Sequence, residues 1–225
     1  MVTAIKIHLN ENLFLRDPEE TSLGRDIISS SIIMIDKLGF EQFTFKKLAR
    51  EMGSTEASVY RYFENKHILL VYLINWYWVW QEYNIEVNIK NIKDTKEQLK
   101  KILSIIAHPA NVGYTQNTSM DIEALHRIVI SEASKSYLTK EVDELNKKGM
   151  YADYKRLCKK IAEFILILNP NYPYAVGLVS MLIEAANHQA FFALHLPSLT
   201  NLKKNDNQMV DVTIFLEQIL FSAIK

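Results

Sequence analysis

The sequence predicts an all-α protein of about nine helices, on the strength of three observations. Of its 225 residues 48% are hydrophobic, which is enough for a real core, while six glycines and five prolines provide few helix breaks. Apolar residues recur at steps of three and four along most of the chain, the spacing of one helix face. Residues that cap helices, such as Asp17 and Thr44, precede several of these segments.

Composition and charge narrow the class of protein. The single cysteine, Cys158, excludes an intrachain disulfide framework and a multi-cysteine metal cluster, and it fits a reducing compartment. The formal net charge is zero, so no global positive excess indicates a nucleic-acid partner. No signal peptide begins the chain, and Asn75, Glu184 and His188 interrupt its most apolar runs. We therefore expect a soluble cytoplasmic protein with no membrane partner.

Three short helices are predicted near the start of the chain. The first follows the Asp17–Pro18 start signal, runs to residue 38 and ends at Gly39. The second follows Thr44, carries one apolar stripe and ends at Gly53. The third runs from residue 55 to 63, with Val59 and Phe63 on its inward face. This arrangement is a helix-turn-helix, which presents its third helix to a DNA major groove.

Helical geometry gives the candidate DNA contacts. With Val59 and Phe63 inward, Arg61 faces outward, where it can bind a guanine, and Tyr60 or Tyr62 can reach phosphate. Helix starts favour anions, so their first residues suit phosphate contacts. The candidate DNA-binding residues are Thr44, Thr55, Ala57, Ser58, Tyr60, Arg61, Tyr62 and Lys66. For the two tyrosines, ordinary packing is the alternative.

The succession Thr44, LAREMG, Thr55, VYRYF and ENKHILL resembles the DNA-binding domain of the tetracycline-repressor (TetR) family over roughly residues 20 to 72. The resemblance implies an all-helical homodimer with a ligand-responsive C-terminal domain. It also implies that the dimer represses transcription by binding a pseudo-palindromic DNA operator, and that a small molecule ends this repression. Ser54 and Glu56 depart from the usual pattern. Glu56 can stabilise the helix dipole, which we favour, or read a cytosine. Residues 20 to 66 balance seven Lys or Arg with seven Asp or Glu, so non-specific DNA affinity should be modest.

The chain is thus expected to comprise an N-terminal arm (1–17), a helix-turn-helix domain (18–66) and a helical regulatory and dimerisation domain (67–225). In the arm, Leu13 to Leu15 should dock near the first and fourth helices, while Lys6, His8 and Arg16 stay exposed. A disordered terminus is the alternative.

The third segment should begin with a long helix from Lys66 that buries one seam and has Trp78 opposite it. Contact of Trp78 with the first helix or a neighbouring one is favoured over an exposed side chain. Further helices are expected at roughly 94–107, 118–136, 139–168, 173–195 and 209–224, with a polar loop over 197–208. The last two are apolar on more than one face and need a second cover. The candidate dimer-interface residues are Phe191, Phe192, Leu196, Phe215 and Leu216, with burial inside the monomer as the alternative.

The effector of such a domain is expected to be an apolar or aromatic small molecule. The candidate ligand-binding residues are Trp76, Trp80, Tyr83, His126, Tyr151, Tyr154, Phe164, Met181 and His188, many of which should simply be core. Glu184 and His188 lie one turn apart, as do Glu123 and His126, but a hydrogen bond is favoured over a metal site for such pairs. We expect neither a metal nor another cofactor.

Enzyme motifs are lacking in the sequence: the six glycines are scattered and form no phosphate-binding loop, and no nucleophile elbow or zinc-protease pattern occurs. Arg156, Lys159 and Lys160 could lower the pKa of Cys158, but an incidental thiol is favoured. The alternative to DNA-binding regulation is a helical interaction or adaptor module that has the same fold and has lost operator binding. This alternative rests on the helix-turn-helix domain (18–66), called the head below, because the charges of residues 20 to 66 balance and the domain carries Glu56.

Overall fold

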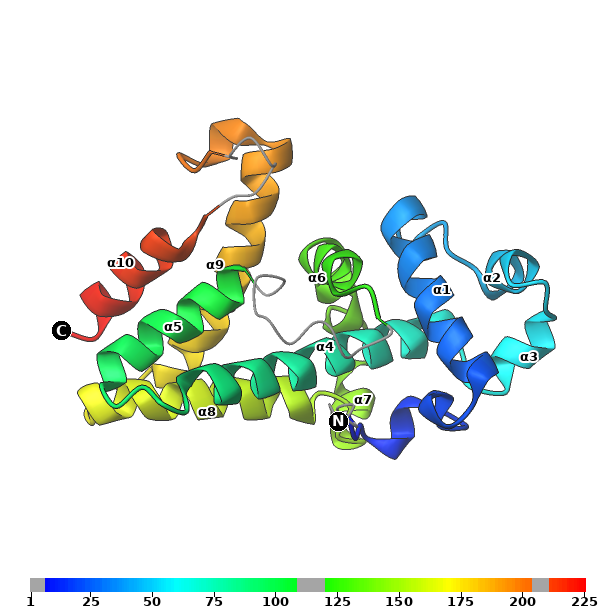
Figure 1. Ribbon diagram of the computed structural model, residues 1–225, viewed down its shortest axis with the longest axis horizontal. Helices are drawn as coiled ribbons and strands as arrows, with labels where there is room; N and C mark the ends of the chain where they lie inside the picture. Colours follow the sequence, from blue (N-terminus) through cyan, green and yellow to red (C-terminus); the bar gives the residue numbers. More distant parts are fainter. Residues whose placement is uncertain (1–6, 109–119, 204–210) are drawn as a thin grey trace. The chain divides into compact units, whose positions relative to one another are not determined.

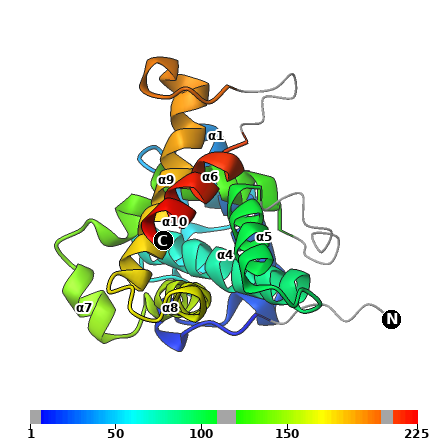
Figure 2. The same ribbon diagram turned by 90° about the vertical axis from the view of Figure 1, so that its left-hand side faces the viewer.

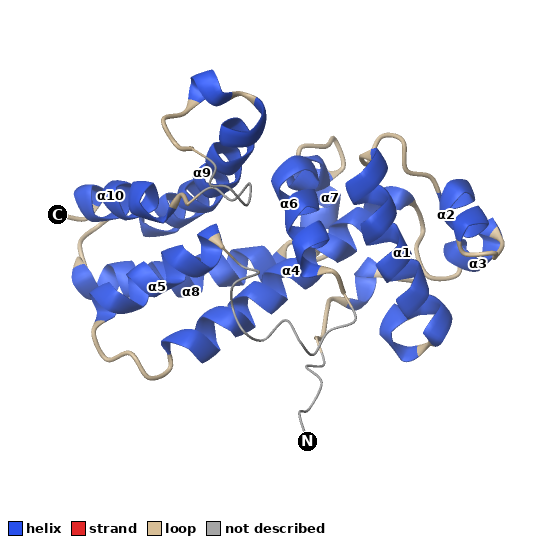
Figure 3. Cartoon of the chain, turned by 45° about the horizontal axis from the view of Figure 1, so that its top comes forward, coloured by secondary structure: helices blue, strands red, loops and turns tan. Residues whose placement is uncertain are grey.

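The computed structural model describes residues 7–108, 120–203 and 211–225, and these contain α-helices and 3-10 turns but no strand (Figures 1 and 3). The helices are α1 (Ser22–Leu38), α2 (Phe45–Glu51), α3 (Glu56–Tyr60), α4 (Lys66–Ile89), α5 (Thr95–Ala107), α6 (Ile122–Tyr137), α7 (Val142–Lys147), α8 (Ala152–Leu168), α9 (Ala175–His195) and α10 (Thr213–Ala223). The all-α prediction is confirmed. Within the described ranges, no helix has both the length and the apolarity that crossing a bilayer requires.

The chain divides into two compact units. The first comprises the described residues up to Val79 together with those from Met120 to Asp153, and the second comprises the rest. The described part of the expected arm and the whole expected helix-turn-helix domain lie within the first unit. The expected segment 67–225 is divided between the two units, because α6 and α7 belong with the N-terminal helices. Helix α4 contributes its first part to one unit and its end to the other.

In the first unit, α1 packs against α2 and α6, and α2 packs against α3. The core is aliphatic beside α1 and aromatic within the helix-turn-helix domain, where Phe43 and Phe63 are fully buried. Both rings contact further aromatic rings edge-on, Phe43 that of Phe45 and Phe63 that of Tyr72. This aromatic layer holds the helix-turn-helix against the start of α4.

The start of α1 differs from the prediction. Asp17 caps a separate 3-10 turn, η2 (Pro18–Glu20), and the α-helix begins at Ser22 with Thr21 as its cap. A Cβ at Gly24 would lie 2.3 Å from the carbonyl oxygen of Pro18. The turn can therefore fold back onto the first turn of α1 only because residue 24 has no side chain. Gly39 ends α1 with a φ of 77°, as predicted.

The N-terminal segment docks in part as expected. Leu13 is buried, and the ring of Phe14 contacts that of Tyr72 edge-on with their centres 6.3 Å apart. Leu15 is 65% exposed, so the prediction that it docks was wrong. The backbone N–H of Leu15 instead donates to the carbonyl of Tyr62 at 2.8 Å. His8 and Arg16 are exposed, and Lys6 lies outside the described residues.

Two predictions for the middle of the chain were wrong. Helix α4 is one helix as expected, but it is buried nearly all round from Ile68 to Ile85 rather than along one seam. Trp78 is only 6% exposed, which agrees with the favoured alternative to an exposed side chain. The single helix expected over 139–168 is two helices, because Gly149 adopts a φ of 74° between α7 and α8. A glycine takes this left-handed conformation without the strain that a Cβ would introduce.

In the second unit, α10 packs against α5 and α9, and α5 also packs against α9 (Figure 2). Asp94 caps α5 by accepting a hydrogen bond from the backbone N–H of Glu97 at 2.9 Å, as its spacing predicts. A charged cluster ties the end of α4 to α8. Glu82, which is nearly buried, accepts hydrogen bonds from Arg156 at 2.8 Å and Lys160 at 3.3 Å.

Candidate DNA-binding site

Helices α2 and α3 are placed by two threonine caps and one glycine turn. The Thr44 hydroxyl accepts a hydrogen bond from the N–H of Lys47 at 3.2 Å, and the Thr55 hydroxyl accepts one from the N–H of Ser58 at 3.3 Å. Gly53 makes the turn between the helices with a φ of 62°. Val59 and Phe63 are fully buried, as the helical spacing predicted.

The opposite side of α3 is open to solvent. Glu56, Ala57 and Arg61 are exposed, and Tyr60 is about half-exposed. The rings of Tyr60 and Phe45 contact edge-on, with their centres 5.0 Å apart. These side chains form a surface that can meet base edges or phosphates. Helix α3 ends at Tyr60, however, so Arg61 stands just past the last helical residue.

The side chain of Arg61 is held in place by its neighbours. Its Nη2 donates to the hydroxyl of Ser58 at 3.0 Å, and that hydroxyl also bonds to the hydroxyl of Thr55 at 2.8 Å. Ser58 is only 8% exposed, so its expected outward position is wrong. Its hydroxyl orients the guanidinium of Arg61, which loses less side-chain freedom on binding a base than a free arginine would.

Tyr62 also departs from the prediction. Because the helix ends at Tyr60, the chain turns and Tyr62 points into the head, where it is 2% exposed. Its hydroxyl bonds to the hydroxyl of Thr21 at 2.8 Å, and Arg16 lies over its ring at 5.6 Å. A buried ring cannot reach a phosphate, so Tyr62 is a packing residue, the alternative left open by the sequence.

Lys66, expected to reach phosphate, has protein partners instead. Its ammonium donates to the carbonyl oxygens of Phe40 at 3.0 Å, Glu41 at 3.2 Å and Phe43 at 3.2 Å. It also lies 4.6 Å from the centre of the Phe40 ring. All three ammonium protons therefore bind the turn between α1 and α2, and a phosphate would have to compete with them.

Two cations of α2 were missed by the sequence reasoning. Lys46 and Arg50 are exposed, and neither has a hydrogen-bond or ion-pair partner among the described residues. Their signal was present in the sequence, since both lie off the apolar stripe of Phe45 and Leu48. With Arg61 they give the helix-turn-helix three outward cations.

The family comparison bears directly on this geometry. Residues 27–73 match the model of the bacterial regulatory proteins of the tetR family, which covers α2, α3, most of α1 and the start of α4. The chain carries a TetR-family DNA-binding domain. No curated protein sequence matches it significantly.

Solved structures of TetR-like fold extend the similarity to most of the chain. The fatty acid degradation regulator FadR from Bacillus halodurans aligns with a TM-score of 0.59 at 16% identity, over 88% of this chain and 93% of its own. AibR, in complex with isovaleryl coenzyme A and operator DNA, aligns with a TM-score of 0.55 at 15% identity, over 89% of this chain and 95% of its own. The superantigen PfiT gives 0.55 at 14% identity, over 92% and 97%. At these identities the likeness shows the fold alone.

The candidate ligand-binding residues of the TetR-like C-terminal part are not gathered in one unit. Trp76, His126 and Tyr151 belong to the first unit, and the other six belong to the second. Trp76 and Trp80 are buried core, whereas Met181 and His188 are exposed. Tyr83, Tyr154 and Phe164 are half-buried in the second unit.

The two histidines considered for metal binding have other partners. Nδ1 of His188 bonds to the backbone carbonyl of Glu184 at 2.9 Å, within the same helix. Nδ1 of His126 bonds to the hydroxyl of Tyr77 at 2.9 Å, and the two rings stack. Among the described residues, no group of three or more potential metal ligands comes together.

The candidate interface residues differ in exposure. Leu196 is 46% exposed, and Phe191, Phe192 and Phe215 are half-buried. Leu216 is fully buried within the chain, so it cannot contact a second copy. For this residue the alternative, burial inside the monomer, is correct. The further exposed apolar side chains on or near α9 and α10 are Tyr174, Val176, Met181, Leu194, Leu199 and Ile214.

Cys158 does not have the reactive character that its basic neighbours suggested. The side chain is buried, and burial raises the pKa of its thiol to about 11. It is an inert core thiol at neutral pH, because the nucleophilic form of cysteine is the thiolate.

Proposed function

We propose that the protein is a transcriptional repressor that binds a pseudo-palindromic operator as a homodimer and is released by an apolar or aromatic small molecule. The observation that carries this proposal is the exposed Arg61, oriented by Ser58 and Thr55 at the end of α3 in a TetR-family DNA-binding domain. An arginine in this position can donate two hydrogen bonds to O6 and N7 of a guanine.

Dimerisation is supported by the apolar side chains that α9 and α10 leave exposed. Val176, Met181, Leu194 and Leu196 on or beside α9, and Ile214 on α10, present a surface that water covers poorly. A symmetric dimer that binds a pseudo-palindrome would place its two heads at successive major grooves, about 34 to 36 Å apart. Light scattering at micromolar concentration tests this, and a monomer would contradict it.

DNA binding is tested with the full-length protein. Binding sites are selected from a random duplex library, and the affinity for the selected and random duplexes is measured by fluorescence anisotropy at two salt concentrations. We expect salt-dependent binding, because phosphate contacts release counterions. Arg61→Ala should cost about 1 to 3 kcal/mol on the selected duplex and little on random DNA. Lys46→Ala is the matched variant, and it should weaken both duplexes alike.

The effector class is tested by adding probes to the protein–DNA complex. An acyl chain is apolar, and the AibR structure of the same fold holds isovaleryl coenzyme A with operator DNA, so acyl-coenzyme A thioesters of increasing chain length are suitable first probes. Release of the duplex that depends on chain length supports an apolar effector. If free coenzyme A, which has no acyl chain, releases the duplex equally well, the apolar effector is contradicted.

The competing function, an interaction module of the same fold, rests on the neutral charge of the head and on the exposed Glu56. The similarity to the superantigen PfiT is a reminder that this fold does not fix one function. Absence of both a selected sequence and salt-dependent binding would favour this module over the repressor.

A further inference from the structure

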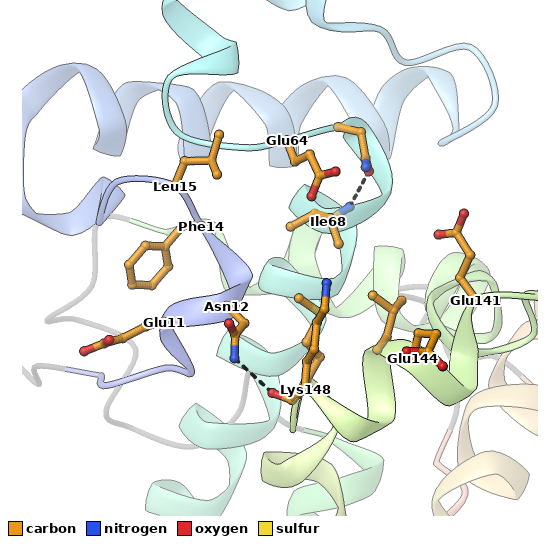
Figure 4. Close-up of a pocket in the computed structure, with 12 residues that line it drawn as sticks. Glu11, Asn12, Phe14, Leu15, Glu64, Ile68, Glu141, Glu144 and Lys148 are labelled. Atoms are coloured by element: carbon orange, nitrogen blue, oxygen red, sulfur yellow. Dashed lines mark hydrogen bonds between the residues drawn. The ribbon is translucent and has the colours of Figure 1, made fainter.

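A pocket of about 480 Å³ opens in the first unit, within the size range of small-molecule sites (Figure 4). Its wall comes from three separate segments: residues 11–15 of the N-terminal segment, residues 64–68 at the start of α4, and residues 141–150 of α7 and the turn after it. None of the ligand-binding candidates from the sequence lines it.

The walls are fixed by hydrogen bonds between the segments. The side-chain amides of Asn10 and Asn12 both donate to the carbonyl oxygen of Lys148, at 3.0 and 3.1 Å. Asn65 caps α4 by accepting from the N–H of Ile68 at 2.9 Å. The left-handed turn at Gly149 gives the Lys148 carbonyl its access to these amides, because a Cβ there would lie 2.9 Å from the Asn10 side chain.

Apolar and acidic side chains share the lining of the pocket. Ile68, Leu145 and Met150 are buried side chains of its wall, and the half-buried ring of Phe14 also lines it. Four glutamates line it as well, and Figure 4 shows Glu11 on the N-terminal side and Glu141 and Glu144 on the α7 side. Lys148 is the one cation among the lining residues.

Of the four carboxylates, one has a cationic partner in the described part of the chain and three do not. Glu144 pairs with Lys147 at 2.6 Å. Glu11, Glu64 and Glu141 have no hydrogen-bond or ion-pair partner among the described residues. A lining that combines apolar side chains with an excess of unpaired carboxylates fits a ligand that has an apolar body and a positive charge.

We propose that this pocket binds a small organic cation, such as a quaternary or primary amine with an aromatic or aliphatic body. The apolar body contacts Phe14, Ile68 and Met150, and the charged group lies between the unpaired carboxylates of Glu64 and Glu141. Such a ligand touches both the N-terminal segment and the turn that joins the recognition helix to α4.

The pocket is connected to the head by short links. Leu15 at its edge donates its N–H to the Tyr62 carbonyl at 2.8 Å, and Glu64 and Asn65 directly precede Lys66, which binds the turn between α1 and α2. Occupation of the pocket should therefore change DNA affinity. That consequence rests on the proposed function, whereas ligand binding itself does not.

Isothermal titration calorimetry on the full-length protein without DNA tests the site. The probe is benzyltrimethylammonium, and phenylacetate is an anion with a similar apolar body. We expect the cation to bind with a dissociation constant of about 1 mM or tighter, and more weakly as salt is added. No binding of the cation, or equal binding of the anion, would overturn the proposal.

Charge variants at exposed positions locate the binding site. Glu64→Gln and Glu141→Gln should each weaken binding of the cation about two- to fivefold, Lys148→Gln should strengthen it, and Glu163→Gln, on α8 in the second unit, should have no effect. Leu15→Lys should also weaken it, because its ammonium would compete for the same carboxylates. Equal affinity in all these variants would place the cation elsewhere. If the cation binds here but the protein does not bind DNA, the repressor proposal fails and this one stands.

Discussion

Arg127 of α6 forms a doubly bonded ion pair with Asp36 of α1: its Nε and Nη2 each lie 2.9 Å from a carboxylate oxygen. Further along α6, Oε1 of Glu132 accepts a hydrogen bond from the backbone N–H of Phe40 at 3.1 Å, and Lys135 pairs with Glu41 at 3.2 Å. Helix α6 is thus bonded to α1 and to the turn that follows it, the same turn that Lys66 holds from α4.

The first prediction concerns this ion pair. A double-mutant cycle with Asp36→Asn and Arg127→Gln should give a coupling free energy of about 0.5 to 1 kcal/mol, since the geometry is bidentate but Arg127 is half-exposed. The same cycle on Glu144 and Lys147, both largely exposed, should give about 0.3 kcal/mol or less. Urea unfolding measures both. A coupling at Asp36 no larger than that of the exposed pair would contradict the expectation.

A second prediction follows from the three carbonyl bonds of Lys66. Lys66→Met keeps the length of the side chain but removes the donor, so the free energy of unfolding should fall by about 1 to 3 kcal/mol. Lys46→Met removes a cation that has no described partner and should stay within about 0.5 kcal/mol of the wild type. The two variants are compared by urea denaturation. Equal stability would mean that the ammonium of Lys66 is not held by the turn in solution.

A third prediction concerns a buried amide in α4. Asn84 is fully buried, and neither its side-chain oxygen nor its nitrogen has a hydrogen-bond partner among the described residues. Replacing it by the similarly sized leucine should raise the free energy of unfolding by about 1 to 3 kcal/mol, because an unpaired polar group is removed from the core. Asn75→Leu is the control: that side chain donates to the Val71 carbonyl at 2.8 Å and should gain less. A loss of stability in Asn84→Leu would reveal a partner for the amide.

The pH dependence of stability gives a fourth prediction. Burial lowers the pKa of His67 below its usual 6.5, although nearby Glu141 acts in the opposite direction. The unfolded chain therefore binds more protons than the folded chain just below pH 6.5, and stability should fall as the pH drops from there towards the folded-state pKa. Thermal unfolding from pH 7.5 to 5 should show a shallower slope for His67→Gln than for the wild type. An equal slope in the two proteins would contradict the expectation.

Local signals predicted most of the fold, and a few side-chain orientations escaped them. Thr44, Thr55 and Asp94 mark their helices because capping depends on the residue itself. Gly149 was missed because helix-forming residues stand on both sides of it, and only tertiary packing decides that it breaks the helix. Tyr62 was misplaced because the helix was expected to continue to Phe63, whereas α3 ends at Tyr60. Ser58 lies within α3, and its hydroxyl bonds to the side chains of Thr55 and Arg61, contacts that helical spacing does not reveal. The partners of Lys66 come from the turn before α2, more than twenty residues away, which no local pattern reveals.

The burial of α4 makes it a natural optical reporter. All three tryptophans of the protein lie in one five-residue stretch of this helix, at positions Trp76, Trp78 and Trp80. Each of them is at most 6% exposed. The two compact units meet in the sequence between Val79 and Trp80. Intrinsic tryptophan emission of the unlabelled protein therefore arises entirely from the stretch of helix in which one unit gives way to the other, and a change in its wavelength or intensity reads out events there without an added dye.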